Sequence, residues 1–147
     1  MKRVNKAIEF AWGVMHDAEK KSSVELGDGT YIANPLQYNK ALSELLDKYV
    51  IQQEIAERKF QRAKEAVASA PVSLKNVTLN GFHALTQAFS PEMSALKDAE
   101  RAAASKLWWN TTIVNTIADH LNTLAERQDK DIDLFKRVCR ASASLTQ

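Results

Sequence analysis

The sequence has one cysteine, few glycines and prolines, and no long apolar run. The single cysteine, Cys139, excludes an internal disulfide framework and favours a reducing compartment, so we expect a cytoplasmic protein. Four glycines and three prolines among 147 residues leave few positions for turns, which favours a small number of long helices. No stretch is apolar enough to cross a bilayer, and the N-terminal segment lacks the cleavage site of a signal peptide. We therefore expect no contact with membranes.

The charge balance also excludes a strong electrostatic field of one sign around the protein. The net charge is +2, and acidic and basic residues are interleaved along almost every segment. The most basic run, Arg58 to Lys64, is flanked by glutamates, and Glu54 lies one helical turn before Arg58. We interpret this run as a solvated helix face and do not expect nucleic acid as a partner.

Residue patterns that carry chemistry are missing from the sequence. His16, His83 and His120 belong to different segments, and no two of them share a helix face. Cys139 follows Phe135 by one helical turn, which predicts a small core residue. There is no nucleophile elbow, phosphate-binding loop or zinc spacing. We expect neither an enzyme, a cofactor, a metal site nor a small-molecule substrate.

Apolar residues recur at spacings of three and four, which predicts an all-α domain. The expected helices cover about 3–21, 35–70, 78–89, 91–127 and 130–145. Strand-forming residues around Gly27 and Gly29 predict a small β-hairpin near 24–32. Asn34-Pro35 and Ser90-Pro91 are start signals for the two longest helices, and the first of these helices should end before Pro71.

The two longest helices are expected to pair as an antiparallel hairpin. The helix 35–70 would be on the order of 50 Å long, longer than a compact domain of this size, and so needs an equally long partner. The alignment of the two apolar stripes places Gln53 opposite Asn110, a polar pair that would fix the register. The shorter N- and C-terminal helices would cover the bulkier end, around Trp109 and Ile113, as a four-helix bundle.

The other end of the hairpin carries mostly alanines and would be left as two helices. Two helices cannot hide their apolar seam fully, so this end is the predicted interface with a partner protein or a second copy. The candidate interface residues are Phe60, Ala63, Val67, Met93, Leu96 and Trp108. The sequence thus predicts a non-enzymatic protein that binds or assembles through its long helices, with homo-oligomers expected. The alternatives are a small nucleic-acid-binding regulator and, below it, a metal or redox bundle.

The Asn34-Pro35 start, followed by Leu42, Leu45 and Tyr49, resembles the helical hairpin subunits of type III secretion needles and rods. The resemblance covers the helix 35–70 only, and no residue role is carried over from it. It implies a further hypothesis, that the chain is a helical subunit or accessory factor of a secretion or phage assembly.

Overall fold

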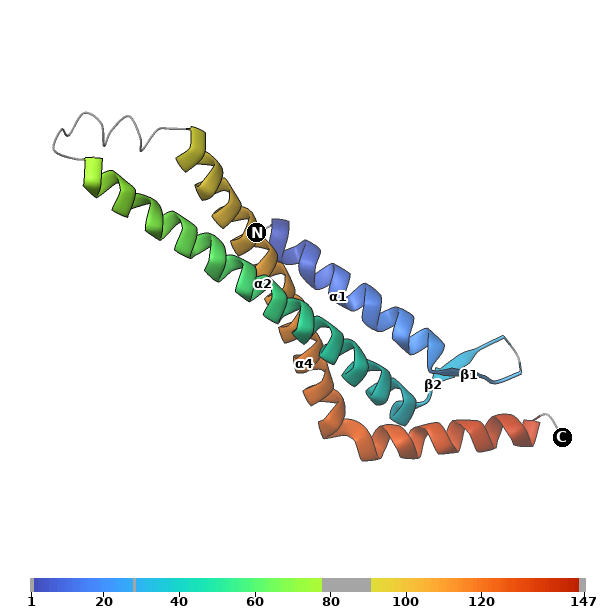
Figure 1. Ribbon diagram of the computed structural model, residues 1–147. Coiled ribbons are helices and arrows are strands. Elements are labelled where there is room, and N and C mark those ends of the chain that lie inside the picture. The colour runs from blue at the N-terminus through green and yellow to red at the C-terminus, as the bar shows by residue number, and fades with distance from the viewer. Residues whose placement is uncertain (1, 28, 78–90, 146–147) are drawn as a thin grey trace. The chain divides into compact units, whose positions relative to one another are not determined.

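The computed structural model describes residues 2–27, 29–77 and 91–145, and side chains within 6–27, 29–69 and 92–143. These residues form three helices and one two-stranded antiparallel sheet (Figure 1). The elements are α1 (Lys2–Lys21), β1 (Ser23–Glu25), β2 (Tyr31–Ala33), α2 (Pro35–Val77) and α4 (Pro91–Leu145). The predicted helical class and the β-hairpin are confirmed. The four-helix bundle is not confirmed, because the described residues contain three helices, and the expected helix 78–89 lies outside them. None of these three helices has an apolar stretch able to span a membrane.

The chain contains two compact units, which we name after the helices described in them. The three-helix unit comprises Met1–Val50 and Thr112–Gln147, and the helix-pair unit comprises Ile51–Thr111. The first part of α2 and the later part of α4 join α1 in the three-helix unit. The remaining parts of α2 and α4 form the helix-pair unit.

The three-helix unit has a core in which α1 contributes three alanines and Met15, and the other helices contribute larger residues. Its buried residues are Ala7, Ala11, Met15, Ala18, Ser22, Tyr38, Leu42, Ile113 and Ile117. Ala7, Ala11, Met15 and Ala18 recur every three or four residues and so share one face of α1, where the alanines allow a close approach of its neighbours. Aromatic edges complete the contacts: the rings of Phe10 and Tyr49 lie 6.2 Å apart, and those of Trp12 and His120 lie 4.8 Å apart.

The β-hairpin connects α1 to α2 in the predicted place. Ser23 pairs with Ala33, and the N–H of Leu26 donates to the carbonyl of Thr30 at 2.9 Å. Gly27 and Gly29 have positive φ angles of 92° and 84°, a conformation that glycine adopts without steric cost. The start of α2 is also as predicted, because Oδ1 of Asn34 accepts the N–H of Leu36 at 3.1 Å.

The hairpin is attached to the last part of α4. The hydroxyl of Ser142 donates to the carbonyl of Leu26 at 2.6 Å. This bond joins residues 116 positions apart in the sequence, so it supplies tertiary support that a two-stranded sheet needs. Tyr31 of β2 is 65% exposed.

Two predicted helix ends are wrong. Helix α2 does not end before Pro71 but continues to Val77. A proline removes one N–H donor from a helix, and α2 tolerates that loss. Helix α4 has no break near residues 127–130, and the separate helix 130–145 is its continuation.

Asp129, Asp131 and Asp133 are typical of a helix start, but they lie inside the continuous helix α4, where two of them pair with arginines. Arg127 lies 3.4 Å from Asp131, and Arg137 lies 2.7 Å from Asp133, both at a separation of one helical turn. No glycine or proline lies in this part of the sequence to end the helix. Such i,i+4 pairs support a helix interior as readily as acidic residues support a helix start. The sequence pattern was therefore ambiguous, and the absence of a breaker decided the outcome.

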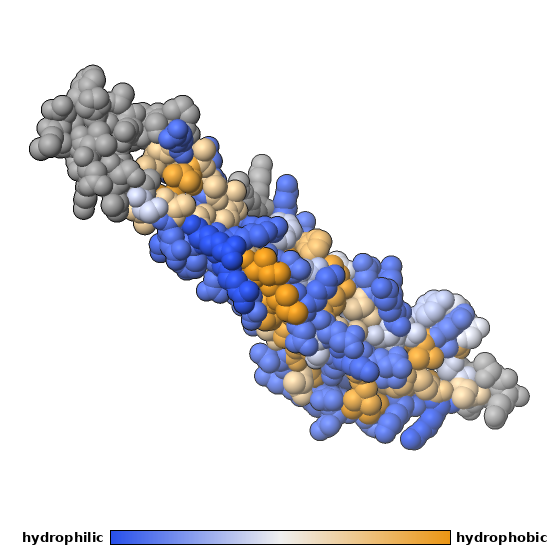
Figure 2. All heavy atoms as spheres, in the orientation of Figure 1, coloured by the Kyte–Doolittle hydropathy of each residue, from blue (hydrophilic) through white to orange (hydrophobic). Residues whose placement is uncertain are grey.

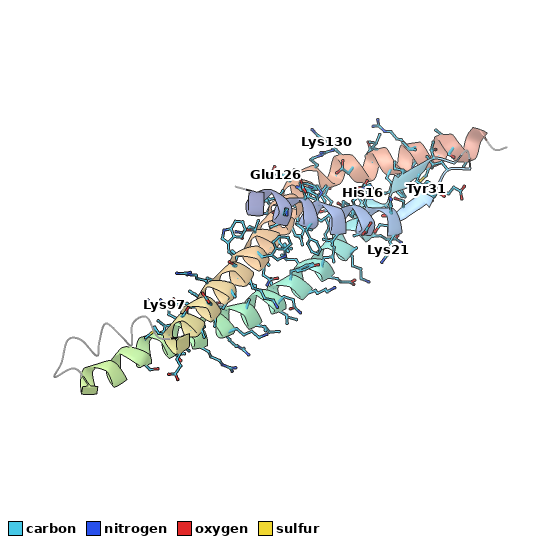
Figure 3. All side chains as sticks on the ribbon, turned by 90° about the horizontal axis from the view of Figure 1, so that it is seen from above. His16, Lys21, Tyr31, Lys97, Glu126 and Lys130 are labelled. Carbon is cyan, nitrogen blue, oxygen red and sulfur yellow. The ribbon has the colours of Figure 1, made fainter. Side chains whose placement is uncertain are left out.

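Helix α4 bends within the three-helix unit. Figure 1 shows the change of direction in the later part of the helix, and Figure 3 places Glu126 and Lys130 beside it. The hydroxyl of Thr123 donates to the carbonyl of Asp119 at 3.0 Å, shortly before the bend. Hydrogen bonds from a threonine to the carbonyl four residues earlier commonly bend helices.

Candidate functional site

The helix-pair unit contains all six residues of the predicted interface, and α2 and α4 run antiparallel in it (Figure 1). Phe60, Ala63, Val67 and Leu96 are half-buried, and Met93 is 8% exposed. These five residues share the spacing of the faces that α2 and α4 turn toward each other. Trp108 differs from them, because it is 38% exposed and lies away from that stripe on α4.

The covered stripe of α4 is more regular than its apolar residues suggested. The apolar pattern has a gap of seven between Leu96 and Ala103, and the half-buried residue that fills it is Glu100. With Glu100 included, the covered residues recur at alternating steps of three and four: Met93, Leu96, Glu100, Ala103, Leu107 and Asn110. This is the spacing of a helix seam. Because this stripe includes a glutamate and an alanine, few large apolar side chains are available to fill the core of the unit.

The expected polar pair in this seam is wrong by one residue. Nε2 of Gln53 donates to Oγ1 of Thr111 at 3.1 Å, not to Asn110. Asn110 is buried, and its Nδ2 donates to the carbonyl of Lys106 in its own helix at 3.1 Å. Because neighbouring residues on a helix point about 100° apart, the choice between Thr111 and Asn110 depends on how the two helices are rotated. A hydrogen bond from Gln53 therefore joins the two helices, but its acceptor is Thr111 and not Asn110.

The outer face of α2 carries two exposed apolar residues that the sequence analysis did not single out. Ile51 is 56% exposed and Ile55 is 40% exposed. They are four residues apart, so they lie one above the other on a face of α2 opposite the seam residues Ala56 and Phe60. Figure 2 shows hydrophobic surface over the middle part of α2. The signal in the sequence was an apolar i,i+4 pair out of phase with the main stripe.

The basic run of α2 is solvated and mixed with acidic residues, as the sequence predicted. Arg58, Lys59, Arg62 and Lys64 are all exposed. A shallow groove of about 360 Å³ along this surface is lined by Glu54, Glu57, Arg58, Gln61, Arg62 and Glu65. Three glutamates on the same groove lower the attraction that a phosphate backbone would experience.

The three-helix unit holds a second feature, a contact of three helices at His120. The hydroxyl of Tyr38 lies 3.3 Å from Nε2 of His120, and the edge of Trp12 meets the same imidazole. Burial lowers the pKa of His120, the charge of Arg127 lowers it further, and the nearby charge of Glu19 opposes both. Burial also raises the pKa of Tyr38 to about 12, with a smaller contribution from Glu19. At neutral pH the pair is therefore an uncharged contact that joins helices.

A half-open groove of about 380 Å³ lies beside His120 within the same unit. Its lining comes from α1, β2, α2 and α4: Glu19, Ile32, Ala33, Pro35, Tyr38, Asn39, His120, Leu124, Arg127, Gln128, Asp131, Leu134 and Phe135. Arg127 is paired with Asp131, and Glu19 is the other carboxylate of the lining. The groove combines apolar walls with the charged residues Glu19, Arg127 and Asp131.

Ligand sets for metals are not found in the described part of the chain, where no group of three or more His, Cys, Asp or Glu side chains could hold an ion. His16 is exposed on α1, while His83 lies outside the described residues. Cys139 is half-buried on α4, as expected of a residue used for packing. Comparison with family models, curated protein sequences and solved structures found no match for this chain.

Proposed function

We propose that this chain is a non-enzymatic helical protein that works by binding another protein, or a second copy of itself, through its long helices. The observation that supports it is the lean, half-covered seam of the helix-pair unit. Among the described side chains of that unit, the buried residues are Ala56, Met93 and Asn110. Burying a large apolar side chain contributes roughly 1.5–3 kcal/mol, and among the described side chains of this unit Met93 is the large apolar one that is buried.

An additional helix would complete this seam. Phe60, Val67 and Leu96 are half-buried, so each has apolar surface in water that a helix laid against the pair would cover. An amphipathic helix that binds in a groove between two others is a common mode of recognition. A partner helix could bind without a rearrangement of α2 and α4, because the seam residues already share one stripe. A reducing, cytoplasmic setting with one unpaired cysteine is part of the same proposal.

The test is the mass of the protein in solution, with co-purified proteins identified. Phe60→Asp and Leu96→Asp should lower the mass or release the partner, because a charge buried in an apolar contact costs several kcal/mol. Gln61→Asp and Ala95→Asp are matched controls, since each adds the same charge at an exposed neighbouring position. Circular dichroism checks that all four variants stay helical. A wild-type protein that is monomeric and brings down no partner would refute the proposal.

The nucleic-acid alternative depends on the basic run of α2. Because glutamates share that surface, we expect weak binding of DNA or RNA that disappears at physiological salt. Binding that is specific in sequence and survives such salt would make this the preferred function. The hypothesis of a secretion or phage assembly subunit is one form of the main proposal, with the partner being further copies of the chain.

A further inference from the structure

We propose that the groove beside His120 in the three-helix unit binds a small amphipathic cation, with its apolar body between the walls of the groove and its ammonium group at Glu19. This site goes beyond the proposed function, because it lies in the other unit and takes a small molecule rather than a protein. No short motif in the sequence indicates it, since the lining residues come from four separate elements.

The groove has the size and the walls of a site for a small ligand. Its volume of about 380 Å³ falls within the range of small-molecule pockets, roughly 300–1,000 Å³. Ile32, Leu124, Leu134 and Phe135 supply the apolar wall. Leu134 is 56% exposed, so a ligand in the groove would remove apolar surface from water. A short alkyl chain or a single ring fits this volume, whereas a helix, about 10–12 Å across with its side chains, does not.

The charges of the lining favour a cation. Its charged residues are Glu19, Arg127 and Asp131. Arg127 and Asp131 form an ion pair with 3.4 Å between Nη2 and Oδ1, so their charges offset each other. Glu19 takes part in none of the ion pairs formed within the described residues, which leaves its carboxylate as the uncompensated charge of the groove. An ammonium group supplies the complementary charge and donates charge-assisted hydrogen bonds to a carboxylate.

The floor of the groove offers acceptors and no competing cation. Burial lowers the pKa of His120, so the imidazole is uncharged at neutral pH and does not neutralise Glu19. The charge of Glu19 acts on this imidazole and on the Tyr38 hydroxyl, which places the carboxylate near the floor. The amides of Asn39 and Gln128 are half-buried in the lining, and their oxygens can accept hydrogen bonds from an ammonium group.

An anionic or neutral ligand of the same size is disfavoured by the same residues. An anion would have to bind at Arg127, which is already paired with Asp131, and would be repelled by Glu19. A neutral ligand would gain the apolar contact but would leave the carboxylate of Glu19 without a partner. The lining therefore discriminates between ligands by their charge.

The experiment titrates the full chain with hexylammonium, hexanol and hexanoate, three probes that have the same apolar body and different head groups. The ring-proton NMR resonance of His120, identified by its loss in His120→Gln, detects binding in the groove. Hexylammonium should shift this resonance saturably, with a dissociation constant at least about fivefold lower than those of the other two probes. Equal constants for the three probes, or no saturable shift, would overturn the proposal.

Substitution of Glu19 tests the position of the head group. Glu19→Gln should raise the dissociation constant of hexylammonium at least about fivefold and leave that of hexanol unchanged. Glu9→Gln is the matched control, because Glu9 is exposed on the same helix and does not line the groove. If Glu19→Gln binds hexylammonium as tightly as Glu9→Gln does, the proposed site is refuted.

Substitution of Leu134 tests the apolar wall independently. Leu134→Lys should weaken hexylammonium binding by a similar factor, and the conservative Leu134→Met should keep the dissociation constant within about twofold of the wild type. Because Leu134 is exposed, both variants should fold, which circular dichroism checks. Unchanged binding in Leu134→Lys would contradict the proposed placement of the ligand. The seam interface is tested by the mass of the protein and its partners, so either proposal can fail without the other.

Discussion

The three-helix unit and the helix-pair unit use the same two long helices but differ in how much of their apolar surface is covered. In the three-helix unit, α1 brings a third face, and Met15, Leu42, Ile113 and Ile117 are fully buried. In the helix-pair unit, α2 and α4 have only each other among the described residues, and Phe60 and Leu96 stay half-buried. The difference indicates that a third helix is what turns an apolar stripe into a core.

The largest expected difference comes from one substitution made in both units. Leu42→Ala should lower the free energy of unfolding by roughly 2–5 kcal/mol, because it leaves a cavity at a fully buried position. Leu96→Ala should lower it by about 1–2 kcal/mol, because part of this side chain is already in water. Urea unfolding followed by circular dichroism measures both. Equal losses would show that the helix-pair unit is as well packed as the other, and would remove the reason to expect a partner there.

The next expected effect is a dependence of stability on pH that belongs to the three-helix unit. The pKa of His120 is lowered in the folded protein, mainly by burial, so the unfolded chain binds more protons as the pH falls through the ordinary value near 6.5. The contribution of His120 to stability is therefore present above that pH and is lost below it. Unfolding midpoints in urea from pH 8 to pH 5.5 should decrease toward acid.

The variant His120→Gln should flatten this decrease, and His16→Gln is the matched control because His16 is exposed on α1. A wild-type midpoint that is constant over this range would contradict the expectation. So would a decrease that His120→Gln leaves unchanged.

A smaller effect is expected from two hydrogen bonds that join helices, one taken from each unit. A double-mutant cycle of Tyr38→Phe with His120→Phe should give a coupling of about 1 kcal/mol, since this contact is partly buried. A cycle of Gln53→Met with Thr111→Val should give about 0.5 kcal/mol, because the helix-pair unit is more hydrated. The free energy of unfolding is again the measurement. A larger coupling energy for Gln53 and Thr111 than for Tyr38 and His120 would contradict this expectation. It would make the Gln53–Thr111 bond the stronger determinant of how the helices are aligned.

The smallest expected effect is that of Cys139→Ser. The thiol is half-buried on α4 in the three-helix unit, so the change should cost less than about 1 kcal/mol. The mass in solution and any partner binding should be unchanged, because neither proposed surface includes this residue. Loss of a partner on this substitution would move the interface to the three-helix unit.

The candidate site was predictable from the sequence in part. The six residues chosen as an interface do lie in one unit, because helical spacing decides which residues share a face. Whether they contact a partner stays a prediction. Ile51 and Ile55 were missed because they are out of phase with the main stripe. Their exposure becomes apparent only when the direction of α4 relative to α2 is known.

Local chemistry by itself determined where most elements begin and what they are. Asn34-Pro35 and Pro91 start helices, and Gly27 and Gly29 allow the hairpin, because caps and positive φ angles depend on neighbouring residues only. The tertiary structure alone decided that Thr111 is the partner of Gln53 and that His120 joins three helices. These contacts depend on how the helices are rotated about their axes, and a rotation of one residue, about 100°, leaves the apolar spacing in the sequence unchanged.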